Sequence, residues 1–194
     1  MFLPIILFII WILLLLLLTK LRLRFFVFIL GCVGLFCFMM YLGKDTAEQY
    51  LEYAVTYCIW IIANATKLFH AFPDYSMVTS YYMSEAISFF IDYECSGFIE
   101  ILVYISLLSF YPVYRLKRKL LLAFIGTLYI FISNIIRVFT ICTIIKYFGP
   151  NLFFFSHTVF ARVLFFSLMV GLYYVVFTKP HILKQKVGNM TYGV

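Results

Sequence analysis

The residues with the most evident chemistry lie in one short segment, Asp-Tyr-Glu-Cys-Ser-Gly, that begins at residue 92. We expect Cys95 to fall at or just before the N-terminus of an apolar helix, where unpaired amide groups and the helix dipole stabilise a thiolate. Ser96 is a suitable N-cap residue, and Gly97 lets backbone or substrate approach closely. Asp92 and Glu94 act in the opposite direction, because neighbouring carboxylates disfavour a second negative charge. A cation from elsewhere in the chain is therefore needed to activate Cys95.

Two further residues lie at the same expected depth as this cysteine. Cys95 precedes Lys117 by 22 residues, Arg137 follows Lys117 by 20, and His157 precedes Lys179 by 22. At a helical rise of about 1.5 Å per residue, each interval covers roughly 30 to 33 Å, which is about one hydrocarbon thickness. If the lysines mark one membrane face, three separate segments bring a thiol, a guanidinium and an imidazole to the opposite face.

A thiol, an imidazole and a guanidinium are the groups that nucleophilic acyl transfer requires. Cys95 would attack a peptide carbonyl, and His157 would take or hand on the proton. Arg137 stays protonated, so it is expected to stabilise the thiolate or the developing oxyanion. Asn134, one helical turn before Arg137, is expected to hold that guanidinium or to donate a further hydrogen bond. Arg162 is expected either as a supporting cation or as a snorkelling side chain.

The composition indicates which class of protein contains these groups. The chain has 194 residues, of which 65% are hydrophobic and 12% charged, and its mean hydropathy is +1.06. A soluble globular domain is excluded, because such domains are about half apolar and a quarter charged. Long apolar runs with few charges indicate a multi-pass membrane protein. The five cysteines show no disulfide framework or CxxC pattern, and the sequence predicts no cofactor and no metal site.

The basic residues indicate the topology. Residues 20–24, 115–119 and 179–186 hold ten basic residues and no acidic one, and the rest of the chain has five basic and eight acidic residues. These clusters are predicted to be cytoplasmic, so the net charge of +7 indicates orientation and not nucleic-acid binding. We expect a cell-membrane protein with its active site on the extracytoplasmic face and its C-terminus in the cytoplasm. The predicted spans are residues 2–18, 25–42, 97–111, 120–137 and 158–178.

The middle of the chain does not fit a simple span. Residues 50–72 are long enough to cross once but contain several polar side chains, so they are predicted to form an amphipathic helix in the outer leaflet. Alternating apolar positions in residues 77–83 and 87–93 predict a small extracytoplasmic β-hairpin. The predicted fold is therefore an all-α integral membrane bundle of about five transmembrane helices, with an outer amphipathic helix and this hairpin. We treat residues 1–194 as one membrane domain.

That domain is divided by function into a helical hairpin (1–49), a catalytic core (50–178) and a cytoplasmic tail (179–194). Within the core, three motifs occur in order: Glu-Cys-Ser-Gly at 94–97, Asn-Ile-Ile-Arg at 134–137 and a lone His157. This arrangement resembles the exosortase/archaeosortase family and is most similar to the short exosortase G branch. The leading region is shorter than that of larger exosortases.

The resemblance implies an integral-membrane cysteine transpeptidase or endopeptidase that acts through a Cys thioester. Its substrates would be membrane-anchored exported proteins whose C-terminal sorting signal consists of a motif, a transmembrane helix and a basic tail. The family's proposed catalytic residues map onto Cys95, Arg137 and His157. The implied partners are this substrate and the lipid bilayer, without nucleic acid. The sequence does not identify the recognition motif, and it leaves an amine, a lipid or water as acceptor.

Two other interpretations remain open from the sequence alone. The chain could be a non-catalytic membrane subunit of an envelope polysaccharide export or assembly complex. It could also be an acyltransferase that moves lipid acyl groups through the same thiol, in which case Cys95 would carry an acyl intermediate.

Overall fold

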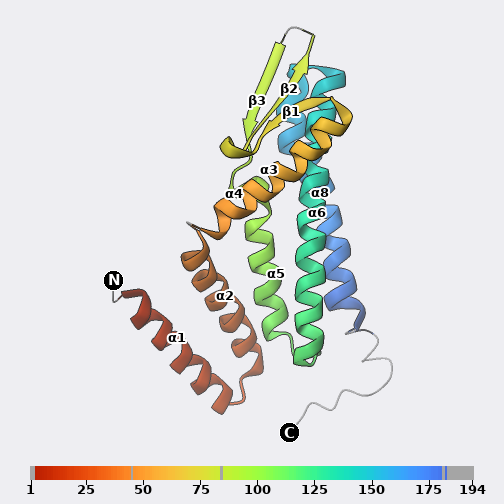
Figure 1. Ribbon diagram of the computed structural model, residues 1–194. Coiled ribbons are helices and arrows are strands. Elements are labelled where there is room, and N and C mark those ends of the chain that lie inside the picture. Colours follow the sequence, from red (N-terminus) through yellow and green to blue (C-terminus); the bar gives the residue numbers. More distant parts are fainter. Residues whose placement is uncertain (1–2, 45, 84, 181, 183–194) are drawn as a thin grey trace.

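The computed structural model describes residues 3–44, 46–83, 85–180 and 182. Figure 1 shows long helices at one end and a small sheet at the other. The α-helices are α1 (Leu3–Lys20), α2 (Arg24–Gly43), α3 (Ala47–Thr66), α4 (Tyr93–Ser96), α5 (Phe98–Phe110), α6 (Leu116–Phe148), α7 (Phe153–Phe155) and α8 (Ala161–Tyr173). Two 3₁₀ turns, η1 (Pro73–Tyr75) and η2 (Pro150–Leu152), and two π-helical turns, η3 (Ser156–Phe160) and η4 (Tyr174–Thr178), join or extend them. The strands are β1 (Phe69–Phe72), β2 (Met77–Tyr82) and β3 (Glu85–Phe90).

The mostly helical, membrane-spanning architecture is confirmed. Three helical stretches, Arg24–Gly43, Leu116–Phe148 and Pro150–Thr178, are long and apolar enough to cross a membrane. The apolar helices Pro4–Lys20 and Phe98–Phe110 are shorter but coincide with the other two expected spans. The count of five spans therefore stays a prediction.

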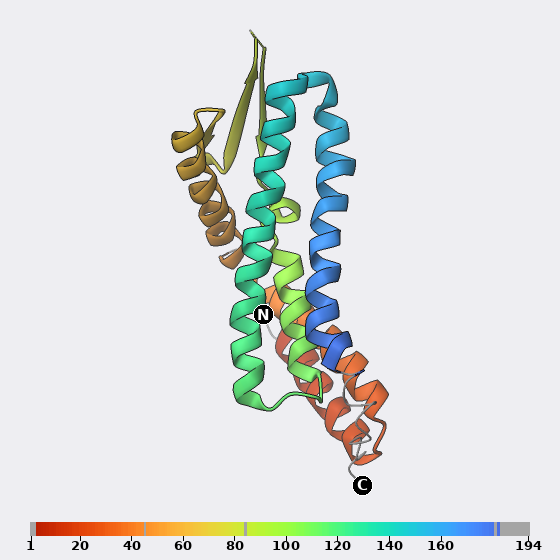
Figure 2. The ribbon, with the colours of Figure 1, turned by 90° about the vertical axis from the view of Figure 1, so that its right-hand side faces the viewer.

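The basic turns lie together at one end of the molecule. In Figures 1 and 2, the α1–α2 turn, the α5–α6 turn and the end of η4 lie at the end opposite the sheet. We call this the inner end, and the end with the sheet the outer end. The arrangement agrees with three basic clusters on one membrane face, while the assignment of that face to the cytoplasm stays a prediction.

The prediction of one amphipathic helix over residues 50–72 is wrong at its C-terminal part. Helix α3 ends at Thr66, because Lys67 adopts a left-handed conformation with φ of 55°. The next residues form β1, in which buried and exposed side chains alternate. This period of two is that of a strand with one covered face. The longer helical pattern that precedes β1 concealed this alternation in the sequence.

The predicted hairpin is present, but it belongs to a three-stranded antiparallel sheet in the order β1-β2-β3. Strand β3 begins and ends earlier than expected, at Glu85 and Phe90. Its inward positions are the apolar residues that the alternation indicated: Ile87 is half-buried, and Phe89 and Ile91 are buried. The sheet lies beside the outer part of α6 (Figure 2).

Helix α6 extends well beyond the span predicted to end at Arg137. It has 33 residues, which corresponds to about 50 Å and exceeds a hydrocarbon thickness of about 30 Å. Its outer part packs against β2, and the Ser80 hydroxyl donates a hydrogen bond to the carbonyl of Cys142 at 3.2 Å. The last helical stretch also starts earlier than predicted, at Pro150. Both helices therefore support the sheet above the expected membrane region.

Two hydrophobic clusters form the core. The outer cluster joins α3, the sheet, the Cys95 turn and the outer part of α6; its buried residues are Val55, Ile59, Ala63, Phe69, Ala71, Val78, Phe89, Ile91, Cys95, Val138, Ile141, Cys142, Ile145 and Ala161. The inner cluster joins α5, α6 and α8; its buried residues are Ile101, Tyr104, Leu108, Ile130, Phe165, Met169, Leu172 and Val176. The residues with candidate chemistry lie where these two clusters meet.

Candidate active site

The Cys95 thiol is held in a one-turn helix between the sheet and α5. After β3, the chain enters α4, where Asp92 is the N-cap: its Oδ1 accepts a hydrogen bond from the Cys95 amide at 3.2 Å. Gly97 then adopts a left-handed conformation with φ of +80°, and α5 starts at Phe98. Cys95 therefore lies in a separate turn just before the apolar helix. This position agrees with the prediction that it falls at or just before the helix N-terminus.

The predicted N-cap is displaced by one residue. Gly97 is the N-cap of α5, while the buried Ser96 accepts a hydrogen bond from the Phe98 amide through Oγ at 3.3 Å. A Cβ at position 97 would lie 3.6 Å from Ile130 Cγ2, which is an ordinary contact. Gly97 is therefore required by its positive φ, which glycine adopts without a steric penalty, and not by a close approach.

His157 contacts the candidate nucleophile directly. The distance from Cys95 Sγ to His157 Nε2 is 3.5 Å, although the residues are 62 positions apart. His157 belongs to the π-helical turn η3, and such turns inside α-helices are frequent at functional sites. It was expected before the final span but lies within the first turns of that helical stretch, so the last helix itself carries the imidazole to the thiol.

Two aromatic rings fix the His157 imidazole. Phe153 stacks on it with a centroid distance of 5.6 Å, and Phe89 meets it edge to face at 6.3 Å. Phe153 is half-buried against His157, whereas its neighbours Phe154 and Phe155 are exposed. The i,i+4 spacing of Phe153 and His157 is the sequence signal that could have indicated this contact.

Helix α6 supplies the polar groups on the other side of Cys95. The Asn134 side-chain amide donates a hydrogen bond to the Cys95 carbonyl, so of its two expected roles the structure shows the donated bond. Asn134 Oδ1 is buried and has no hydrogen-bond partner in the described part of the chain. Arg137, one turn further out, is only 4% exposed, and its guanidinium carbon lies 5.6 Å from the Phe165 ring centroid. Cys95, Asn134 and His157 are thus in contact, with Arg137 next to Asn134 along α6.

The remaining predicted site residues belong to α8 and α4. Arg162 is exposed in the first turn of α8. Glu94 lies in α4, but its side chain is outside the described structure. Neither position assigns a function.

Carboxylates approach this region from α3. Burial raises the pKa of Glu52, and the neighbouring Glu48 and Asp92 raise it further. Asp92 is the residue that caps the Cys95 turn, so the side of the site that faces α3 is acidic. A positive charge for a thiolate therefore has to come from the opposite side, where α6 and η3 provide Arg137 and His157.

Sequence reasoning also missed Glu100. It lies half-buried in the first turn of the apolar helix α5, with Oε2 shielded from solvent. An acidic residue inside an apolar segment is costly and is a functional candidate by default. Its presence in a predicted span was visible in the sequence and could have identified it.

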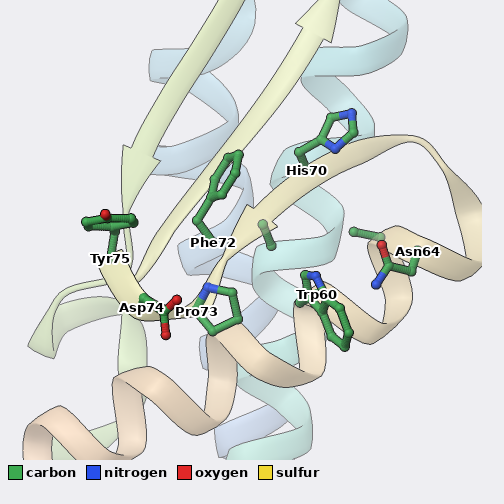
Figure 3. A pocket seen from close by; sticks show the side chains of 9 residues that line it. Trp60, Asn64, His70, Phe72, Pro73, Asp74 and Tyr75 are labelled. Atoms are coloured by element: carbon green, nitrogen blue, oxygen red, sulfur yellow. The ribbon is translucent and has the colours of Figure 1, made fainter.

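A pocket separate from the Cys95 site lies at the β1 edge of the sheet. It has a volume of about 300 Å³ and is formed by α3, β1 and η1, with Trp60, Asn64, His70 and Asp74 among its lining residues. Figure 3 shows these side chains around the opening. Neither Cys95 nor His157 lines it. Cys95 itself is only 4% exposed, so a substrate has to displace covering side chains to reach Sγ.

Comparisons with known proteins identify the family of the chain. No curated protein and no solved structure matches the chain. The family model described as transmembrane exosortase (Exosortase_EpsH) matches residues 1–174, so the similarity begins well before residue 50 and includes α1 and α2. Because this match covers most of the chain, the protein belongs to the transmembrane exosortase family.

Proposed function

We propose that the protein is a membrane cysteine transpeptidase or endopeptidase that cleaves C-terminal sorting signals of exported proteins. Family membership supports a membrane enzyme that processes sorting signals. The observation that carries the specific chemistry is the 3.5 Å contact between Cys95 Sγ and His157 Nε2. A thiol beside an imidazole is the arrangement of an activated cysteine nucleophile.

In the proposed reaction, His157 Nε2 takes the Cys95 proton, and the thiolate attacks the carbonyl carbon of the scissile peptide bond. Arg137 stabilises the thiolate or the oxyanion that forms. Collapse of the tetrahedral intermediate breaks the C–N bond, and the leaving amine receives the proton from His157. The products are a Cys95 thioester and the released membrane anchor of the substrate. An amine or a water molecule then attacks the thioester and regenerates the thiol.

Asn134 acts in this scheme as a positioning residue. Its hydrogen bond to the Cys95 carbonyl fixes the α4 turn against α6, and the Asp92 cap fixes the same turn from the sheet side. Holding a nucleophile in a defined geometry is a large part of catalysis, because small displacements of reacting atoms slow a reaction strongly.

The proposed orientation places the inner end in the cytoplasm and the site near the outer membrane surface. The substrate's own transmembrane helix would then lie beside the bundle with its basic tail next to the basic turns. Its motif would reach Cys95 from the outer side. This proposal includes the specific relation to the short exosortase G branch, for which the motif order is the support.

The test uses two buried cysteines of the same chain. The wild type, Cys95→Ala and Cys142→Ala are each co-expressed with tagged membrane proteins that end in a short motif, an apolar helix and a basic tail. Cys142 is fully buried in the outer cluster and serves as the matched control. We expect Cys95→Ala to leave the substrate uncleaved and Cys142→Ala to cleave it, as seen by the size of the tagged fragment. Cleavage by Cys95→Ala at the wild-type rate would contradict the proposal.

A further inference from the structure

In the described part of the chain, strand β3 pairs with β2 on one side and has no neighbouring strand on the other. In Figure 1, β3 is at the border of the sheet, and α3 passes beside the opposite edge. Helix α3 packs against β1, so the two edges of the sheet differ: one is covered by a helix and the other is open.

The register shows which backbone groups face the open edge. The Ile91 amide donates to the Ser76 carbonyl at 2.7 Å, which continues the antiparallel register of β2 and β3. Hydrogen-bonded and non-hydrogen-bonded pairs alternate in such a ladder, so residues 87 and 89 also face β2. The amides and carbonyls of Ala86, Ser88 and Phe90 therefore point away from the sheet. The 2.9 Å contact between the Thr79 and Ser88 hydroxyls fits a non-hydrogen-bonded pair, whose side chains are closer together.

This edge lacks the features that normally prevent pairing. Proteins protect open edges with lysine, proline, bulges or a covering element. Strand β3 has the sequence Glu-Ala-Ile-Ser-Phe-Phe, whose one charge is at the end distant from Cys95. The exposed side chains of Ala86, Ser88 and Phe90 are small or apolar. An unprotected edge of this kind is suited to accept another extended chain.

The open edge also leads directly to the candidate nucleophile. Only Ile91, Asp92 and two residues of α4 separate the end of β3 from Cys95. The strand runs from the outer tip of the sheet toward the helices (Figure 1). A substrate whose motif precedes its transmembrane helix would run in the same direction, from outside into the membrane.

We propose that the substrate segment just before the scissile bond binds to the open edge of β3 as a fourth, parallel strand. This inference rests on the proposed function and adds the mode of substrate recognition. Six residues of β3 cover about 20 Å, enough to align a short motif and to place the next carbonyl at Cys95. Recognition would come largely from substrate backbone groups, and the exposed residues of β3 would contact every second side chain of the substrate segment.

Backbone N-methylation of the substrate gives the sharpest test. The full-length protein is reconstituted with synthetic peptides that contain the motif and membrane helix of a substrate cleaved in a Cys95-dependent manner. One amide upstream of the scissile bond is methylated in each peptide. Because alternate amides of a paired strand face its neighbour, we expect kcat/KM to fall at least tenfold at every second position and to change little at the positions between. A flat or monotonic profile, with unmodified peptide still cleaved through Cys95, would overturn this inference and leave the proposed function intact.

A variant of β3 tests the same edge from the enzyme side. Ser88→Pro removes an outward amide that makes no bond to β2, and proline is tolerated at such edge positions. Ser88→Ala is the matched control, because both variants lose the hydroxyl contact with Thr79 but only proline loses the amide. We expect Ser88→Pro to raise KM at least fivefold over Ser88→Ala. Equal KM values in two folded variants would contradict the inference, and if Ser88→Pro fails to fold the methylation profile decides.

Discussion

The outer and inner clusters both bury polar groups in a largely apolar protein, but they use them differently. In the inner cluster the Tyr104 hydroxyl donates to the Leu122 carbonyl at 2.8 Å. Nearby, Tyr111 and Tyr114 donate to the Phe177 and Val176 carbonyls of η4, each at 2.7 Å. Each hydroxyl therefore donates to a main-chain carbonyl of a helical segment other than its own. These bonds hold α5, α6 and the last helix together.

Next to the outer cluster, the polar groups contact one another. Cys95 meets His157, Asn134 holds the Cys95 main chain, and Arg137 lies one turn along. A thiol and an imidazole within hydrogen-bond distance can exchange a proton, whereas a tyrosine hydroxyl on a carbonyl cannot do so near neutral pH. We infer that buried polar groups in this protein serve two roles, chemistry at the outer end and association of helices at the inner end. Substitutions at the outer end should change chemistry, and those at the inner end should change stability.

Beyond Cys95 itself, the largest effect on the cleavage rate is expected from substitution of His157. We expect His157→Ala to lower the cleavage rate by about 10² to 10⁴-fold, which is the usual contribution of a general base. His70→Ala is the matched control, because His70 is an exposed histidine on β1. Cleavage kinetics with the substrate in excess measure this. An equal loss in both variants would remove the distinction between the site and the outer surface.

An intermediate effect is expected at Gly97. Its φ of +80° is unfavourable for residues with a Cβ, so Gly97→Ala should cost about 1–2 kcal/mol and displace the Cys95 turn. Gly171→Ala, in α8 with no atom within 4 Å of the added Cβ, should instead leave stability unchanged or raise it slightly. Unfolding in denaturing detergent, together with the cleavage rate, compares the two. A stable and fully active Gly97→Ala would show that the turn geometry is not required.

The smallest effect is expected at the inner end. Tyr104→Phe removes the hydroxyl bond to Leu122 but keeps the ring, so it should lower the free energy of unfolding by about 1 kcal/mol. The cleavage rate per folded molecule should stay unchanged, because Tyr104 lies in the inner cluster and not at the thiol. A strong loss of activity without loss of stability would mean that the inner cluster also shapes the reaction.

Several elements of the fold were accessible from the sequence because local rules decide them. Apolar runs and basic turns indicated the helices, and period-two alternation indicated β2 and β3. Strand β1 was missed although its pairing with β2 is local, because the short strand directly follows a helical pattern that ends before Lys67. The outer extension of α6 was missed for a different reason: beyond Arg137 the helix is stabilised by packing against β2, which no local pattern contains.

The candidate site was partly accessible. Counting residues to the basic turns placed Cys95, Arg137 and His157 at one depth, but depth does not determine contact. The 3.5 Å contact depends on the π-helical turn η3 and on the rings of Phe89 and Phe153. The π turn and the contact with Phe89, which lies on a distant segment, have no reliable sequence signature, whereas the contact of Phe153 with His157 is indicated by their i,i+4 spacing. The N-cap was displaced to Gly97 because its left-handed conformation ends α4 and starts α5.

The central claim is that Cys95 forms a covalent thioester with the N-terminal part of the cleaved substrate. The most direct measurement is mass spectrometry of the acid-quenched protein after brief reaction with substrate, with and without hydroxylamine, which cleaves thioesters. We predict a hydroxylamine-sensitive adduct on the Cys95 peptide whose mass equals the upstream substrate fragment minus water, and none on the Cys142 peptide. Rapid cleavage of the substrate without any adduct on Cys95, and at the same rate in Cys95→Ala, would contradict the account.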